Sequence, residues 1–242
     1  MSGGFFPPTR ASVVEAARSG DAVLRARAVE TLVAAYWRPV YRHVRRKWGK
    51  GHEEAADLTQ DFFAELLERD LLARFDPSKA KLRTYLRVCV DGLVANAEKA
   101  AGRQKRGGGV SPLSLDFEGA REELERALAA PGESPEREFE KEWARSVLEL
   151  GLARLELALA GRGKGIAARL FEIYDLGAEG EPPPPYSALA QRFGVSVSDV
   201  TNGLSLARRE LRRIVLGLLG EMTGSEEEFR LEARTLLGVD GP

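Results

Sequence analysis

Apolar residues recur at intervals of three and four along most of the chain, and this spacing constrains the fold more than any other feature of the sequence. Such intervals place successive side chains on one face of an α-helix, where they can be buried together. No segment is rich in the alternating pattern of a half-buried strand. We therefore predict an all-α protein, with helices at about residues 12–20, 22–48, 53–69, 81–101, 139–160, 166–176, 186–193, 197–219 and 225–237.

Glycine and proline divide these helices into groups. Gly107–Gly109 ends the first group, and the stretch that follows, to about Glu136, is acidic and rich in proline, which predicts a linker with one short helix. Pro182–Pro185 predicts a rigid spacer within the second group. Within the first group, Asp76–Ser78 is a break, and Ser78 is expected to cap the next helix.

The composition excludes several kinds of site. A single cysteine, Cys89, cannot form an internal disulfide, and His43 and His52 alone cannot complete a zinc site. Cys89 lies in an apolar run and is expected to be a small buried side chain. Gly161–Gly165 lacks the spacing of a phosphate-binding loop. No apolar run is long enough to cross a membrane, and Met1–Arg10 lacks the features of a signal peptide. We expect a cytoplasmic protein that is not an enzyme, with no metal, no cofactor and no membrane partner.

Residues 186–200 have the pattern of a helix-turn-helix. Gly194 allows the turn, and Ser196 or Ser198 can cap the second helix. The exposed face of that helix offers short polar side chains that can reach base edges, followed by arginines that can reach phosphates. These residues are Ser198, Asp199, Thr201, Asn202, Ser205, Arg208, Arg209, Arg212 and Arg213. The alternative is an ordinary helical hairpin with a basic, solvated face, and Asn202 and Gly203 weaken the helix.

Basic residues form two runs, although the net charge of the whole chain is −1. The first run, Arg38–Lys50, contains six basic residues and no acid. The second run comprises Lys99, Arg103, Lys105 and Arg106, opposed only by Glu98. Charge runs are usually solvated faces, but two of them in a nearly neutral protein suggest a path for a phosphate backbone.

Acidic residues form a stripe on the predicted helix at 53–69. They occur at intervals of three and four and therefore share one helix face: Glu54, Asp57, Asp61, Glu65 and Glu68. An acidic stripe repels DNA, so it faces either water or a basic protein partner. The residues alone leave both interpretations open.

Several short motifs resemble the extracytoplasmic-function class of sigma factors, and the resemblance spans nearly the whole chain. Glu54–Phe63, Glu-Ala-Ala-Asp-Leu-Thr-Gln-Asp-Phe-Phe, resembles the region 2.2 signature of that family. Phe75-Asp-Pro with Leu82-Arg-Thr-Tyr-Leu86 resembles the segment that leads into the promoter-melting helix. Three further segments are typical of a subgroup with a longer linker: Lys105-Arg-Gly-Gly-Gly109, Leu113-Ser-Leu-Asp116 and the opening Phe6-Pro-Pro-Thr9.

The resemblance implies two helical domains joined by an acidic linker, in a factor that directs core RNA polymerase to promoter DNA and assists DNA melting. Its expected parts are an N-terminal helical extension at 1–28, region 2 at 29–106, the acidic linker at 107–138, a region 4 helix-turn-helix domain at 139–220 and a tail at 221–242. The linker would thread through the nucleic-acid channels of the polymerase, where its negative charge imitates nucleic acid.

The resemblance also implies three sets of contact residues. The basic polymerase clamp would be bound by Asp57, Gln60, Asp61 and Glu65. The minus-ten element and its unpaired strand would be bound by Asn96, Lys99, Arg103, Lys105 and Arg106. The minus-thirty-five element would be read in the major groove by Ser198, Thr201, Asn202, Ser205, Arg208, Arg209 and Arg212.

The chain departs from the family pattern at several positions. Ala56 replaces an acid of the 2.2 signature, and the other differences are Tyr85 for Trp, Gly92 and Asn96 in the melting helix, and Thr201 and Leu206 where basic residues are expected. The missing acid suggests that a Ser/Thr kinase strengthens clamp docking by phosphorylating Thr59, although the helical wheel places Thr59 in the apolar half of its helix. An anti-sigma factor is the other candidate regulator.

Two other functions are compatible with the sequence. A helix-turn-helix regulator that binds DNA independently of polymerase would use residues 186–213 but would not need the acidic stripe. A degenerate sigma-like adaptor is the second alternative, and the departures at Gly92, Thr201 and Leu206 leave room for it.

Overall fold

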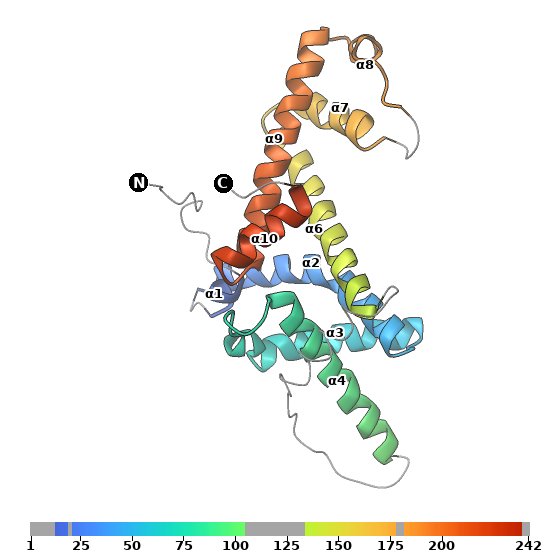
Figure 1. Ribbon diagram of the computed structural model, residues 1–242, viewed down its shortest axis with the longest axis vertical. Coiled ribbons are helices and arrows are strands. Elements are labelled where there is room, and N and C mark those ends of the chain that lie inside the picture. Colours follow the sequence, from blue (N-terminus) through green and yellow to red (C-terminus); the bar gives the residue numbers. More distant parts are fainter. Residues whose placement is uncertain (1–12, 19–20, 105–133, 178–181, 239–242) are drawn as a thin grey trace. The chain divides into compact units, whose positions relative to one another are not determined.

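All regular elements of the described chain are helices, which confirms the predicted all-α fold (Figure 1). The computed structural model describes residues 13–18, 21–104, 134–177 and 182–238. Its elements are α1 (Val13–Arg18), α2 (Ala22–Lys47), α3 (His52–Glu68), the 3-10 helix η1 (Leu71–Arg74), α4 (Leu82–Gln104), α6 (Pro135–Ala160), α7 (Gly165–Asp175), α8 (Tyr186–Phe193), α9 (Val197–Met222) and α10 (Glu226–Leu237). Each helix with strong apolar periodicity is present, and its ends lie within a few residues of the prediction. The short helix expected in the linker lies outside the described residues.

The chain divides into two compact units. Unit 1 comprises residues 1–146 and 220–242, and unit 2 comprises residues 147–219. One division falls within α6 and the other near the end of α9, so each of these two helices contributes to both units.

In unit 1, α2 packs against α1, α3 and α4. Side chains that are almost completely buried fill its core, including Leu32, Tyr36, Phe62, Leu66, Leu82 and Leu86. Tyr85, which replaces the tryptophan of the family pattern, packs its ring 5.4 Å from that of Phe75 and donates its hydroxyl to the Leu71 carbonyl at 2.6 Å. The phenol therefore fastens η1 to α4. Cys89 is buried, as expected, and burial raises the pKa of its thiol to about 12.

The start of α4 differs from the prediction. Ser78 donates its backbone N–H and its hydroxyl to the Asp76 carboxylate, at 3.0 and 2.7 Å. Helix α4 begins only at Leu82, so the prediction that Ser78 caps it was wrong. Ser78 instead belongs to a short Asx-type turn, in which its hydroxyl is already bonded to Asp76.

Asp91 of α4 joins the end of α2 to the middle of α4. Its carboxylate accepts hydrogen bonds from His43 Nε2 at 2.8 Å, Trp48 Nε1 at 2.9 Å and Lys47 Nζ at 3.2 Å. Burial alone would raise the pKa of Asp91, but the hydrogen bond and charge of His43, the charge of Lys47 and the hydrogen bond from Trp48 lower it to about 2. The half-buried, ionised carboxylate therefore binds three side chains at the end of α2.

Asp91 should make unit 1 sensitive to acid. Because its pKa is lower in the folded than in the unfolded state, its stabilising effect is complete above about pH 4 and is lost as the pH falls toward 2. The shift corresponds to about 2 kcal/mol. We expect Asp91→Asn to remove this part of the pH dependence of the unfolding free energy, measured by urea denaturation between pH 5 and pH 2. An unchanged slope in the variant would contradict the assignment.

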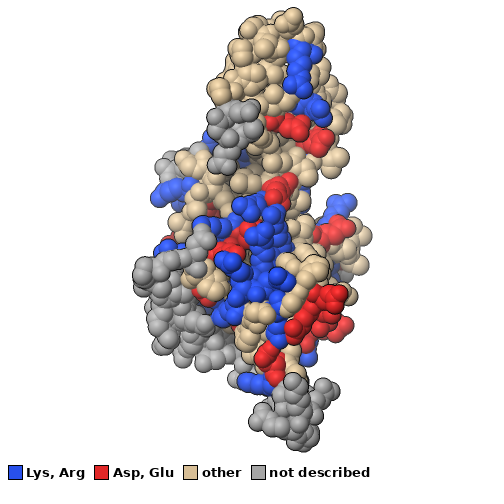
Figure 2. All heavy atoms as spheres, turned by 90° about the vertical axis from the view of Figure 1, so that its right-hand side faces the viewer, with Lys and Arg blue, Asp and Glu red and all other residues tan. Residues whose placement is uncertain are grey.

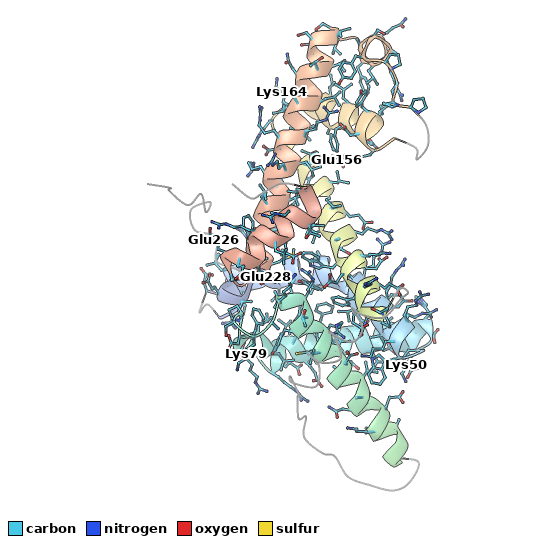
Figure 3. All side chains as sticks on the ribbon, in the orientation of Figure 1. Lys50, Lys79, Glu156, Lys164, Glu226 and Glu228 are labelled. Atoms are coloured by element: carbon cyan, nitrogen blue, oxygen red, sulfur yellow. The ribbon has the colours of Figure 1, made fainter. Side chains whose placement is uncertain are left out.

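The C-terminal helix α10 belongs to unit 1 and packs beside the start of α4. Ser225 caps α10 by accepting the Glu228 N–H at 3.2 Å, and Glu228 in turn accepts the Gly224 N–H at 3.0 Å (Figure 3). Glu232 is 1% exposed and pairs with Lys81 at 2.8 Å and Arg83 at 2.6 Å. The tail is thus fixed to the segment that leads into α4 by buried charge as well as by apolar packing.

Gly224 should be required for this docking. A Cβ atom added at Gly224 would lie 2.5 Å from Pro77 Cβ and 3.1 Å from Phe75 Cε1. We expect Gly224→Ala to destabilise unit 1 by about 1–3 kcal/mol in thermal or urea unfolding. Gly217→Ala is the matched control, because a Cβ there, in the C-terminal part of α9, meets nothing within 4 Å. The control should stabilise by up to about 1 kcal/mol through helix propensity; equal effects of the two changes would contradict the packing.

Unit 2 is built from the second half of α6, α7, α8 and α9. Its core includes Leu159, Leu170, Leu189 and Leu204, all nearly inaccessible. Gly203 has a packing role, because a Cβ at this position would lie 3.1 Å from Leu170 Cδ1. The glycine that weakens the helix locally therefore permits a close approach of α7 to α9.

Candidate functional site

The acidic stripe of α3 is solvent-facing, and its members differ in their partners. Glu54 pairs with Lys50 at 2.7 Å, and Glu65 is half-buried and pairs with Arg69 at 3.2 Å. Asp57 and Asp61 are exposed and have no ion-pair partner among the residues that the structure describes. These two carboxylates therefore keep their charge available to a partner.

An apolar surface lies near this stripe. Trp37 of α2 is 38% exposed and stacks on Phe63 of α3, with ring centroids 5.7 Å apart and planes inclined by 14°. Leu67, farther along α3, is 47% exposed. A surface of this kind suits a partner that presents basic and apolar side chains together. The sequence prediction included the exposed Gln60 but not Trp37, since an aromatic side chain at helical spacing is usually buried.

Thr59 lies on the opposite side of α3 and is fully buried. Its hydroxyl donates to the Ala55 carbonyl at 2.7 Å. A kinase would reach it only after local unfolding of the helix. The burial agrees with the helical wheel and disfavours the phosphorylation hypothesis.

Asn96, Lys99 and Arg103, which are predicted to bind the minus-ten element, lie in the second half of α4. Asn96 is half-buried and Lys99 is exposed. Arg103 lies within α4, but its side chain is outside the described residues, as are Lys105 and Arg106 entirely. Near this segment, Lys50 (labelled in Figure 3) binds both Glu54 at the start of α3 and Glu98 in the second half of α4, which links these two helices.

The turn between α8 and α9 places the start of α9 in solvent. Gly194 adopts a left-handed conformation, with φ of 65°. Ser196 Oγ accepts the Asp199 N–H at 3.0 Å, and the Asp199 carboxylate accepts the Ser196 N–H and hydroxyl at 3.0 and 2.6 Å. These hydrogen bonds lower the pKa of Asp199. Ser196, rather than Ser198, is therefore the cap, in a reciprocal capping arrangement.

Every residue predicted to read the minus-thirty-five element is exposed on α9, but the arginines differ in their surroundings. Arg208 reaches both oxygens of Asp175, at 2.8 and 3.2 Å, and its guanidinium lies 5.7 Å from the Tyr174 ring centroid. Arg209 and Arg212 have no ion-pair partner within the described part of the chain. Arg208 thus joins α9 to α7, whereas the other two remain available for an anion.

The basic run of α2 also has partners within the protein. Arg38 and Arg42 pair with Glu142 at 3.0 and 3.1 Å, and Arg46 pairs with Glu138 at 2.8 Å. Figure 2 shows a broad cluster of Lys and Arg side chains on one face, with Asp and Glu side chains beside it. The sequence interpretation of this run as a solvated phosphate path did not foresee these carboxylates.

Comparison with known proteins identifies the segment that carries the acidic stripe. Residues 32–104 match the family model for Sigma-70 region 2. This segment is therefore similar to sigma-70 region 2. The matched segment begins within α2 and ends at the last residue of α4, so it comprises the second part of α2 together with α3, η1 and α4. No curated protein and no solved structure matches the chain. In the described residues, no helix combines the length and apolarity that a membrane crossing needs.

The two classes of arginine on α9 can be separated by stability measurements. We expect Arg208→Ala to lower the unfolding free energy by up to about 1 kcal/mol, because it removes the paired contact with Asp175. Arg209→Ala is the control and should change it by less than about 0.5 kcal/mol. Thermal unfolding of both variants tests this difference, and an Arg208→Ala variant as stable as wild type would refute it.

Proposed function

We propose that this protein is a sigma factor of the extracytoplasmic-function class, which directs core RNA polymerase to promoters and assists DNA melting. The observation that carries the proposal is the match of residues 32–104 to Sigma-70 region 2. The order of the motifs at Glu54–Phe63, Phe75–Pro77 and Lys105–Gly109 supports the particular class. The protein would act by binding and positioning, without catalysis of its own and without a cofactor.

Clamp docking would use Asp57, Gln60, Asp61 and Glu65. The exposed, unpaired carboxylates of Asp57 and Asp61 support this assignment, because folding leaves them without a basic partner in the described chain. Complementary charge then steers the two proteins together and fixes their orientation. The exposed Trp37, stacked on Phe63, would add apolar contact to the same interface.

Promoter binding would use two separate sets of residues. Asn96, Lys99, Arg103, Lys105 and Arg106 would bind the minus-ten element and its unpaired strand by stacking and phosphate contacts. A region 4 domain at residues 139–220 would place the helix-turn-helix formed by α8 and α9 in the major groove of the minus-thirty-five element. Its base-edge contacts would come from Ser198, Thr201, Asn202 and Ser205. Phosphate contacts would come mainly from Arg209 and Arg212, since Arg208 is engaged by Asp175.

The remaining parts have more general roles in this proposal. The acidic linker at 107–138 would pass through the nucleic-acid channels of polymerase. An anti-sigma factor or a Ser/Thr kinase would supply regulation. The cell compartment would be the cytoplasm, where polymerase and promoters are found.

Run-off transcription tests the proposed function. Purified core RNA polymerase and genomic promoter fragments from the source organism are incubated with and without the protein. We expect discrete transcripts that depend on the protein. The double variant Asp57→Lys and Asp61→Lys should abolish them, because the reversed charges repel a basic clamp. Glu227→Lys is the control: it is an exposed acid on α10, outside the stripe, and should transcribe like wild type.

Other outcomes would support the alternative functions. Co-purification with core polymerase without transcripts would favour a sigma-like adaptor. Stable binding to duplex DNA without polymerase binding would favour an independent helix-turn-helix regulator. Either result would contradict the proposed initiation function.

A further inference from the structure

The first half of α6 carries an acidic and aromatic pattern that matches its surroundings in unit 1. Residues 136–143 read Glu-Arg-Glu-Phe-Glu-Lys-Glu-Trp. On a helix, residues four apart share a face and lie about 6 Å apart along the axis. The pattern therefore produces two rows of glutamates with a row of aromatic side chains between them. These rows are Glu136 with Glu140, Glu138 with Glu142, and Phe139 with Trp143.

The inner glutamate row binds α4. Glu136 pairs with Arg87 at 3.2 Å, and Glu140 pairs with Arg83 at 3.1 Å. The side chains of Glu136 and Arg87 are only 6% and 4% exposed. Removing one partner of such a buried pair leaves an uncompensated charge, so the Glu136–Arg87 pair holds α6 in place.

The aromatic row fills the space behind the charges. Phe139 and Trp143 are buried, and each ring lies 6.4 Å from that of Tyr36 of α2. Phe139 also meets the His43 ring edge-on at 5.7 Å. Apolar burial of two large aromatic side chains fixes the first half of α6 against α2 independently of the outer charges.

The outer glutamate row binds α2 in a different environment. Glu138, which is 17% exposed, pairs with Arg46, whose side chain is 60% exposed. Glu142 is only 5% exposed and pairs with Arg42 and Arg38, which are 42% and 38% exposed. Exposed ion pairs are weak and are screened by salt. Arg46 can therefore exchange Glu138 for another anion, while the inner row, the aromatic row and the buried Glu142, which also pairs with Arg145 at 3.0 Å, keep α6 docked.

Spacing and charge suit a nucleic-acid backbone at this surface. Arg38, Arg42 and Arg46 are four residues apart on α2, and the exposed Arg45 lies next to Arg46. In place of regularly spaced phosphates, α6 presents two carboxylates to this row. A nucleic acid that binds such a row releases its condensed counterions, which favours binding. A glutamate of the same chain has no condensed counterions to release, so its pairing with the arginines lacks this contribution.

We propose that Arg38, Arg42, Arg45 and Arg46 form a nucleic-acid phosphate-binding surface, in which Glu138 is an exchangeable internal competitor and the buried Glu142 is a fixed counter-charge. This surface lies outside the three contact sets of the proposed function and does not depend on polymerase. The carboxylates reduce binding to DNA of any sequence and leave the fold unchanged. Strong engagement would then need a duplex that other contacts hold beside α2.

The test uses the two partners of one ion pair. Glu138→Gln and Arg46→Gln both break the same contact, so a purely structural role predicts effects in the same direction. The proposal predicts opposite directions for binding of the full chain to a fluorescein-labelled 20-base-pair duplex of arbitrary sequence. Fluorescence anisotropy at 0.1 M KCl should give about three- to fivefold tighter binding for Glu138→Gln and a similar loss for Arg46→Gln.

Two measurements distinguish nucleic-acid binding at this surface from binding at α9: the salt dependence, and binding by a variant that lacks the α9 arginines. The slope of log K against log salt should steepen in Glu138→Gln by about 0.9 for each additional phosphate bound. The changes should persist in a chain that also carries Arg209→Ala and Arg212→Ala, which removes the α9 phosphate contacts. Glu156→Gln is the matched control, because Glu156 is an exposed glutamate in the second half of α6 with no ion-pair partner in the described chain (Figure 3).

The outcomes distinguish this proposal from the proposed function. Effects of the same sign in both variants, or no effect in either, would overturn the phosphate-binding surface even if transcription is supported. Opposite effects in a protein that fails to support transcription would leave the surface standing and remove the initiation function.

Discussion

A buried arginine connects the elements on which the rest of unit 1 depends. Arg83 is 6% exposed and lies where α4, α6 and α10 meet. It pairs with Glu140 and Glu232, and its guanidinium lies 4.8 Å from the Trp143 ring centroid. Burial alone would lower the pKa of Arg83, but the two carboxylates raise it above its ordinary value. A buried charge is tolerated only when it is compensated in this way, so segments distant in sequence must arrive together.

Folding sorts the many charged residues into those that are satisfied internally and those that are not. Arg38, Arg42 and Arg46 of α2 are paired by α6, and Arg208 is paired by α7. Asp57, Asp61, Arg209 and Arg212 stay unpaired within the described chain. Asp57 and Asp61 lie on unit 1 and Arg209 and Arg212 on unit 2, which fits the proposed binding of a basic protein partner and a nucleic acid through separate surfaces.

The sequence predicted the positions of the helices, but it predicted the contacts of individual side chains only in part. The apolar spacing and the break at Gly194 located α8 and α9 closely, because both signals are local. Ser78 was predicted to be a cap because serine commonly caps helices. The sequence does not show that the Asp76 carboxylate binds its hydroxyl instead. Gly203 was treated as a weakness, since contact with Leu170 of α7 cannot be read from its neighbours in sequence. The exposure of the predicted site residues on α3 and α9 followed from helical periodicity.

The sequence by itself determined the helices, their exposed faces and the region 2 match, because a period of 3.6 residues and a short motif are local properties. Only the tertiary structure decided which charges neutralise each other. Arg46 and Glu138 are 92 residues apart in sequence, and Lys81 and Glu232 are 151 apart. Such pairs form where apolar packing brings two helices together, and that packing depends on the whole core of the unit and not on the residues adjacent to either charge.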